Sequence, residues 1–409
     1  MSLTPSLPNA ENLLGEQYNF LELLKLGFYS GHLVVEGGPG TGKSVVAALR
    51  ALEVAGNDKR VLLLFFNRPV REYMLHALRK KPVNWDVDNF VKTCHSWLYS
   101  KSDFLKKSYP KPYEISLPLV DWESVHRDLS YSLKVGKILP YDEIIVDEAQ
   151  DIPLGFFKCL KLVTKRIICF IDPAQAIGPF KLDVKSLENE LGDFENIEFK
   201  ANYRNPPQII EAATVFSGGD VPYSRAANNS RPVVWDCGND FAKVIYNISC
   251  IVKKYYRKKS IGIIVSPNST AQCPVMNKCY LSLLEELRKD PYSEKFRVLC
   301  NDGSKNKDKD VFKDFFSKGG VKIFTFNTVK GLEFDIVILL VDPLLHRNNY
   351  SLDKEYKSKL YVAMTRAKEK CYLLYNSGLD YRKDFSYDVL PLLKEHSRKF
   401  DWWGSDKHY

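Results

Sequence analysis

A glycine-rich loop near the amino terminus carries the clearest chemistry in the sequence. An apolar run at 33–35 precedes the loop, and apolar residues at helical spacing follow it. Backbone N–H groups that no side chain shields can surround phosphate oxygens, Lys43 can reach the β- and γ-phosphates, and the Ser44 hydroxyl can coordinate Mg²⁺. The spacing therefore predicts a strand, loop and helix that bind a nucleoside triphosphate through Gly37, Gly38, Pro39, Gly40, Thr41, Gly42, Lys43 and Ser44.

Two further apolar segments end in side chains that suit phosphate chemistry. One strand pattern runs into Asp147 and Glu148, and another runs into Asp172 and Gln175. Asp147 can hold the water shell of Mg²⁺, and Glu148 can polarise the attacking water. Acidic residues at the strand ends of an α/β sheet lie at the edge where ligands bind. We therefore expect Asp147 and Glu148 beside the glycine-rich loop, the alternative being an exposed acidic turn.

These groups require a scaffold of parallel strands. Apolar strands alternate with helical patterns, which predicts a doubly wound parallel α/β sheet. A polar stretch at about 98–140 predicts a small insertion with a helix near 121–134. The pattern restarts near residue 200, so we expect domains at 1–200 and 201–409. In the second domain we expect strands at 232–235, 261–265, 321–326, 335–341 and 371–375, loops at 266–276 and 301–309, and a reduced insertion at about 266–320.

The composition is that of an ordinary folded protein of 409 residues, with a net charge of +9 that favours a polyanionic partner. The nine cysteines include no C-x-x-C pair, so we expect them reduced and mostly buried. No apolar run approaches the roughly 20 residues that span a bilayer, and no leader pattern begins the chain. We therefore expect a cytoplasmic protein without a membrane partner.

The order of these segments resembles that of superfamily 1 helicases of the UvrD/Rep type, from Gln17 to about residue 366. The matching segments are Gln17, the loop at 37–44, and residues 65–74, 93–97, 146–151, 171–177, 202–210, 325–339 and 359–370. The resemblance implies two tandem RecA-like P-loop NTPase domains without the family's large accessory insertions. It also implies ATP and Mg²⁺ as cofactors and a single-stranded nucleic acid as partner, with DNA favoured over RNA.

The resemblance further implies roles in ATP hydrolysis. It assigns the metal to Ser44 and Asp147, and catalysis to Lys43, Glu148, Gln175, Arg204 and Arg366. Arg204 and Arg366 would reach the γ-phosphate from the second domain, where a guanidinium can contribute on the order of a thousandfold in rate. The implied nucleotide contacts outside the loop are Gln17, Tyr203, Gly331 and Glu333. Taken alone, Gln17 would be a solvated helix residue and Arg204 a surface arginine.

The sequence indicates the nucleic-acid contacts less specifically than the nucleotide contacts. The family's base-stacking aromatic residues match Phe66, Trp97 and Phe180, although each is also a plausible core residue. Contacts to phosphates or bases are implied for Asn67, Thr93 and His95. The basic run at 253–259 fits the solvated end of a helix better than a binding site. Two departures, Ile171 for the family's Gly and Asn327 for its His, weaken inferences about coupling between hydrolysis and strand contacts.

Together with these residues, the resemblance implies an ATP-dependent helicase or translocase that moves on single strands. The 3′-to-5′ direction is implied only by analogy, because residues 330–335 resemble the 3′-to-5′ subgroup of the family. The alternative is a nucleic-acid-stimulated ATPase subunit that switches a partner nuclease or other effector and unwinds little by itself. A third possibility, a nucleic-acid clamp without hydrolysis, conflicts with the intact catalytic set.

Overall fold

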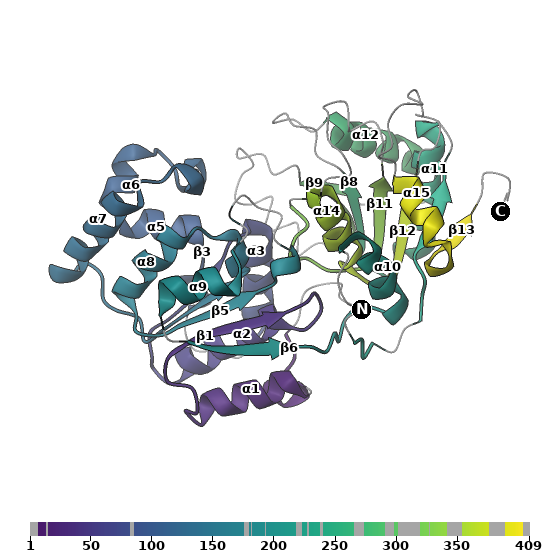
Figure 1. Ribbon diagram of the computed structural model, residues 1–409. Helices are drawn as coiled ribbons and strands as arrows, with labels where there is room; N and C mark the ends of the chain where they lie inside the picture. Colours follow the sequence, from purple (N-terminus) through teal and green to yellow (C-terminus); the bar gives the residue numbers. More distant parts are fainter. Residues whose placement is uncertain are drawn as a thin grey trace. The chain divides into compact units, whose positions relative to one another are not determined.

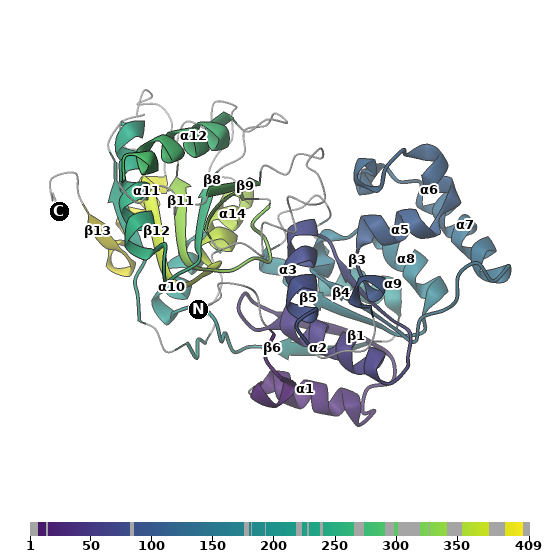
Figure 2. The same cartoon turned by 180° about the vertical axis from the view of Figure 1, so that it is seen from behind.

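The chain divides into two compact units, Pro5–Ala201 and a second that begins at Asn202. Each is described by itself and is drawn as a ribbon in Figures 1 and 2. The computed structural model describes residues 7–13, 15–81, 86–175, 180, 182–192, 194–217, 223–226, 229–237, 240–265, 274–290, 298–301, 320–326, 328–341, 354–375 and 389–403. Asn327 lies outside these residues.

A six-stranded parallel sheet forms the centre of the first unit. Its order is β3-β2-β4-β5-β1-β6. The strands are β1 (His32–Gly37), β2 (Val61–Phe65), β3 (Val91–Thr93), β4 (Glu143–Asp147), β5 (Ile167–Ile171) and β6 (Phe194–Phe199). Strands β2, β4 and β5 are buried along their whole length because helices cover both faces of the sheet.

Helices pack on both faces of this sheet. In Figure 2, α1 (Glu16–Lys25), α2 (Lys43–Gly56) and α3 (Arg68–Leu78) cover one face. On the other face, the core contains residues of α5 (Cys94–Lys101), α7 (Trp122–Lys134), α8 (Leu154–Val163) and α9 (Val184–Leu191). The short helices α4 (Val87–Phe90) and α6 (Asp103–Ser108) complete the unit. The helix expected near 121–134 is confirmed as α7, which Asp121 caps by accepting a hydrogen bond from the Ser124 N–H.

The sequence patterns did not predict strand β6. Its three polar residues, Glu195, Asn196 and Glu198, are exposed, and among the described strands it pairs with β1 alone. An edge strand needs only one buried side and commonly carries charges that prevent further pairing. Its residues therefore lack the apolar run that marks the inner strands.

The second unit is built on a seven-stranded parallel sheet with the order β13-β7-β12-β11-β8-β10-β9. The strands are β7 (Val233–Asp236), β8 (Ile261–Val265), β9 (Val298–Asn301), β10 (Val321–Thr325), β11 (Phe334–Val341), β12 (Ala367–Tyr375) and β13 (Asp401–Trp403). All five expected strands are present. Two parallel α/β sheets, the fold class expected of tandem RecA-like domains, are thereby confirmed.

The helices of the second unit also lie on both sheet faces (Figure 1). Helices α11 (Phe241–Tyr255) and α12 (Pro274–Arg288) share one core with the sheet, while α10 (Pro207–Ser217) and α14 (Lys354–Met364) pack together on the other face. Helix α15 (Val389–Glu395) follows β12 in the chain. The prediction of a loop at 266–276 is wrong for its last three residues, because α12 begins at Pro274. Residues 266–273 lie outside the described residues. The loop expected at 301–309 also lies outside them, except Asn301, which ends β9.

Two other expectations concern side-chain exposure. Helix α11 ends within the basic run at 253–259, where Lys253, Lys254, Arg257 and Lys258 are exposed, as expected for the solvated end of a helix. Of the seven cysteines whose side chains the structure describes, all except the half-buried Cys250 are buried. Among the described helices, none is both long and apolar enough to cross a membrane.

Candidate functional site

The glycine-rich loop joins the end of β1 to the start of α2, as the spacing predicts. Gly40 and Gly42 have φ values of 74° and 85°, which L side chains adopt only with strain. A Cβ atom on Gly37 would lie 2.8 Å from Thr41 Oγ1 and 3.0 Å from the Phe199 carbonyl oxygen. The loop can follow this path only because these positions have no side chain.

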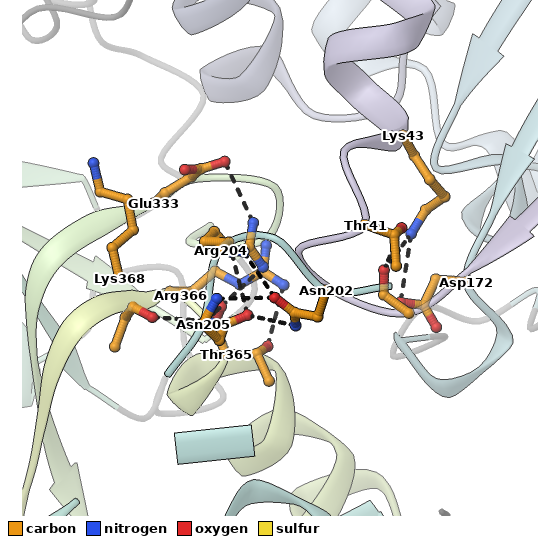
Figure 3. A network of polar contacts seen from close by, with 12 residues as sticks. Thr41, Lys43, Asp172, Asn202, Arg204, Asn205, Glu333, Thr365, Arg366 and Lys368 are labelled. Carbon is orange, nitrogen blue, oxygen red and sulfur yellow. Dashed lines mark hydrogen bonds and ion pairs between the residues drawn. The ribbon is translucent and has the colours of Figure 1, made fainter. Parts of the chain in front are cut away.

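Lys43 is buried at the first position of α2 and turns back over the loop. Its Nζ donates hydrogen bonds to the carbonyl oxygens of Gly37, at 2.5 Å, and Gly38, at 2.9 Å. The same nitrogen lies 3.7 Å from Asp172 Oδ2, at the end of β5 (Figure 3). The loop therefore holds a lysine ammonium at the edge of the sheet, where phosphate oxygens could replace its carbonyl partners.

Asp147 ends β4 and is 1% exposed. Neither carboxylate oxygen accepts a hydrogen bond of normal geometry within the described part of the chain. Burial and the nearby Glu148 carboxylate raise the pKa of Asp147 to about 7, while the Ser44 hydroxyl and Lys43 favour its ionised form. A buried acceptor without a partner needs an explanation, and Mg²⁺ with its water shell would supply one. The residues present therefore fit a magnesium ion.

Glu148 follows Asp147 with an unusual backbone conformation, a φ of 56° in the left-handed region. Its Oε2 accepts a hydrogen bond from Gln150 Nε2. Gln150 Oε1 in turn accepts from the Asp172 N–H at 3.1 Å, and Asp172 Oδ2 accepts from Gln175 Nε2 at 2.6 Å. The three predicted residues Glu148, Gln175 and Lys43 are thus joined through Gln150 and Asp172.

Gln150 and Asp172 were not among the predicted site residues. Asp172 immediately follows the apolar strand β5, and the sequence pattern placed it at a strand end without giving it a role. Its ion pair with Lys43 shows that it belongs with the residues of the loop. Gln150 offered no comparable signal, because its contacts depend on how the two strand ends are placed.

Gln17 lies on α1 and is buried against the glycine-rich loop. Its Nε2 donates to the Thr41 carbonyl oxygen at 2.5 Å, and a Cβ atom on Gly42 would lie only 2.2 Å from that nitrogen. It is therefore no solvated helix residue. Its expected contact with the nucleotide stays a prediction.

In the second unit, the structure brings Arg204, Glu333 and Arg366 together (Figure 3). Arg204 lies 3.3 Å from Glu333 Oε1 and donates to the Thr365 carbonyl oxygen at 2.9 Å. Arg366 is buried, and its Nε donates to the Val362 carbonyl oxygen at 2.9 Å. The contacts of both arginines with a γ-phosphate stay predictions.

The other two nucleotide residues expected in this unit lie on loops. Tyr203 precedes Arg204, and its ring centroid lies 5.7 Å from the Arg225 guanidinium. Gly331 has a φ of 78°, which favours glycine in the turn before β11. Their contacts with nucleotide also stay predictions.

One nucleic-acid residue requires correction. Trp97 is 1% exposed and packs edge-on against Phe156, while its Nε1 donates to the Tyr141 hydroxyl at 3.3 Å. A base cannot stack on a ring enclosed in this way, so Trp97 is a core residue. It was misassigned because the short segment around it gave no indication of which way the ring points.

The remaining nucleic-acid candidates stay predictions. Phe66 and Phe180 are half-buried at the margin of the core, and the ring of Phe66 lies 5.7 Å from that of His95. The Thr93 hydroxyl accepts a hydrogen bond from the Ser96 N–H and so caps α5, and Asn67 occupies the cap position of α3. These residues lie at the carboxyl ends of the neighbouring strands β2 and β3: Thr93 ends β3, and Phe66, Asn67 and His95 come after the strand ends.

Comparison with known proteins assigns a family domain to each unit. Residues 22–181 match the model of an AAA domain, and residues 320–374 match that of the UvrD-like helicase C-terminal domain. A search of curated proteins found no match.

Two helicases are among the solved structures similar to this chain. The PRRSV helicase is 14% identical, with a TM-score of 0.38, over 87% of this chain and 55% of that one. The arterivirus nonstructural protein 10 helicase is 15% identical, with a TM-score of 0.39, over 86% and 60%. The chain thus spans less than two thirds of the length of either protein.

The two family models agree with the residues already described. The AAA match contains the glycine-rich loop, Asp147 and Glu148, and the UvrD-like match contains Glu333 and Arg366. The chain thus combines an AAA domain with a UvrD-like helicase C-terminal domain, in the order expected of a compact UvrD-like superfamily 1 helicase.

Proposed function

We propose that this protein is an ATP-dependent translocase or helicase that moves along single-stranded nucleic acid. DNA is the favoured strand and 3′ to 5′ the favoured direction, both by analogy with UvrD-like helicases. The observation that carries the proposal is the buried carboxylate of Asp147, whose oxygens accept no hydrogen bond of normal geometry from the described residues, in the same unit as a complete phosphate-binding loop.

The residues of the first unit have separate roles in the proposed hydrolysis. Lys43 exchanges its carbonyl partners for phosphate oxygens, and Ser44 and Asp147 hold the metal. Mg²⁺, when bound, offsets the charge of the β- and γ-phosphates. Glu148 orients the attacking water and accepts its proton, and the hydrogen bond from Gln150 fixes the position of that carboxylate. Gln175, which is bonded to Asp172, contacts the γ-phosphate.

The second unit contributes positive charge to the same reaction. Arg204 and Arg366 stabilise the charge that spreads over the transferring phosphoryl group. An arginine that reaches phosphate only when ATP is bound ties the closure of the two domains to the nucleotide. Alternating closure and opening would change the grip on a nucleic-acid strand held by residues such as Phe66 and Asn67.

A second candidate function is a nucleic-acid-stimulated ATPase that switches a partner protein such as a nuclease. The insertion at about 98–140 contains α6, α7 and short 3-10 turns. An insertion of this size offers few residues that could act as a wedge between the strands of a duplex. It also exposes large apolar side chains, with Leu119 at 78%, Tyr131 at 60% and Leu139 at 59%. Apolar surface of this kind suits a protein partner when it is contiguous.

One series of assays tests both candidates. ATP hydrolysis should be measured alone, with single-stranded DNA and with single-stranded RNA, followed by unwinding of partial duplexes with a 3′ or a 5′ overhang. We expect stimulation by DNA and unwinding only from the 3′ overhang. Stimulation without unwinding from either overhang would favour the switch, and no hydrolysis under any condition would refute both candidates.

A further inference from the structure

We propose that Asn205 is a positioning residue that fixes the two arginines of the second unit relative to each other. This inference rests on the proposed function, because it assumes that Arg204 and Arg366 act on ATP. The Asn205 side chain is completely buried and contacts both arginine-bearing segments, residues 202–205 and 365–367. Figure 3 shows this network.

On one side, Asn205 contacts the segment that carries Arg204. Its Oδ1 accepts hydrogen bonds from Asn202 Nδ2 at 3.1 Å and from Arg204 Nε at 3.4 Å. The side-chain oxygen of Asn202 accepts from the backbone N–H groups of Arg204 and Asn205, both at 2.9 Å. These bonds close the segment into a tight turn and fix the direction in which the Arg204 side chain leaves it.

On the other side, Asn205 brackets Arg366. Its Nδ2 donates to the carbonyl oxygens of Thr365, at 2.8 Å, and Ala367, at 2.6 Å, which are the residues before and after Arg366. The Arg366 carbonyl oxygen accepts from the Phe334 N–H at 3.0 Å. Three consecutive carbonyl groups therefore have fixed partners, and two of those partners are the hydrogens of one amide.

Only a carboxamide can bond both segments in this way, because its two N–H hydrogens reach the carbonyl oxygens of Thr365 and Ala367 while its oxygen accepts from Asn202 and Arg204. An aspartate at this position would place a second acceptor against two carbonyl oxygens. An alanine would remove every hydrogen bond of the Asn205 side chain. In either variant the segments that carry Arg204 and Arg366 lose the bridge through this amide and keep only the direct bond from Arg204 to the Thr365 carbonyl oxygen. A displacement of about 1 Å at a reacting group can cost on the order of a hundredfold in rate.

The test compares Asn205→Ala and Asn205→Asp with Asn247→Ala in the full chain. Asn247 is a matched control because it is also a buried asparagine of the second unit, on α11, where its Nδ2 lies 3.3 Å from Cys237 Sγ. We expect the Asn205 variants to lower kcat by roughly ten- to a hundredfold with ATP affinity within about threefold of wild type. Asn247→Ala should leave kcat within about twofold at a similar loss of Tm.

A comparison of combined variants separates positioning from general damage. If Asn205 acts through the two arginines, adding Asn205→Ala to a variant that carries both Arg204→Ala and Arg366→Ala should lower kcat little further. Full multiplication of the two losses, or a kcat for Asn205→Ala equal to that of Asn247→Ala, would overturn the inference. Should the alanine variant fail to fold, Asn205→Ser, which keeps one donor, provides the same comparison.

The single variants Arg204→Ala and Arg366→Ala distinguish an error in the role of Asn205 from an error in the role of the two arginines. If both lower kcat and Asn205→Ala does not, the inference about Asn205 is wrong and the proposed function stands. If neither lowers kcat while the wild-type protein hydrolyses ATP, the proposed role of the arginines is wrong.

Discussion

The glycine-rich loop of the first unit and the arginine cluster of the second are held by different means. The loop takes its shape from the backbone, with glycines at positive φ and a lysine bonded to the carbonyl oxygens of its own loop. The arginine cluster depends on side-chain contacts between distant segments, such as the bond between Arg204 and the Thr365 carbonyl oxygen, 161 positions apart.

This difference predicts different responses to mutation. A change in the loop should act on nucleotide binding, because the loop itself forms the binding surface. A change in the arginine cluster should act on turnover, because the cluster orients groups that matter most in the transition state. The predictions below run from the largest expected effect to the smallest, and those at Gly42 and Glu333 test this contrast directly.

The largest effect should come from Glu148→Gln, which keeps the shape of the side chain but removes the proton acceptor. We expect kcat to fall on the order of ten-thousandfold with ATP binding retained. Single-turnover hydrolysis together with equilibrium binding of a fluorescent nucleotide measures both quantities. Normal turnover in this variant would mean that another residue is the base.

Phe66→Ala tests whether the first unit also presents a surface for bases. Loss of one stacked base should weaken binding of single-stranded DNA by about 1–3 kcal/mol, or roughly five- to 150-fold. Trp97→Ala is the matched aromatic change, and we expect it to destabilise folding by about 3–5 kcal/mol instead. Fluorescence anisotropy with labelled DNA and thermal unfolding distinguish the two, and unchanged DNA affinity in Phe66→Ala would contradict the stacking role.

Gly42→Ala tests the backbone-built pocket directly. The φ of 85° adds strain of roughly 1–2 kcal/mol for an L side chain, and the new Cβ would meet Gln17 Nε2. We expect ATP affinity to fall by about tenfold or more. Gly56→Ala, at the end of α2, is the control, because a Cβ there meets nothing within 4 Å. Equal effects of the two changes on nucleotide binding would refute the argument.

The smallest effect should come from Glu333→Gln. The Arg204 and Glu333 side chains are 13% and 30% exposed, and ion pairs accessible to solvent contribute only about 0–1 kcal/mol. Arg204 keeps its bond to the Thr365 carbonyl oxygen, so kcat should change by less than about fivefold. Steady-state kinetics at low and high salt measures this, and a loss as large as that of Arg204→Ala would show that the ion pair positions the arginine.

The same contrast explains how far the sequence predicted the site. The loop residues act within a few positions of one another, so their spacing alone indicated phosphate binding. Arg204, Arg366 and Glu333 could be assigned only by resemblance, since nothing near them in the chain indicates their common location. Asn205 was missed because its partners lie 160 and 162 positions away.

The fold was predictable to a similar degree. Inner strands such as β4 and β8 are buried along their whole length and form apolar runs that can be recognised in the sequence. The edge strand β6 and the helix α12 gave weaker patterns and were missed. The predicted base stacking on Trp97 was wrong for a further reason. The burial of this ring depends on Phe156 and Tyr141, which come from other parts of the chain.

The enclosed indole of Trp97 has a practical consequence for spectroscopy. A tryptophan shielded from water emits at short wavelength and is reached poorly by aqueous quenchers. A change in its emission during a titration with oligonucleotide would therefore report a rearrangement inside the first unit rather than a base resting on the ring. Because the chain has six tryptophans, this emission must be recorded in a variant in which the other five are replaced, and there it is better suited to following unfolding than to counting bound nucleotides.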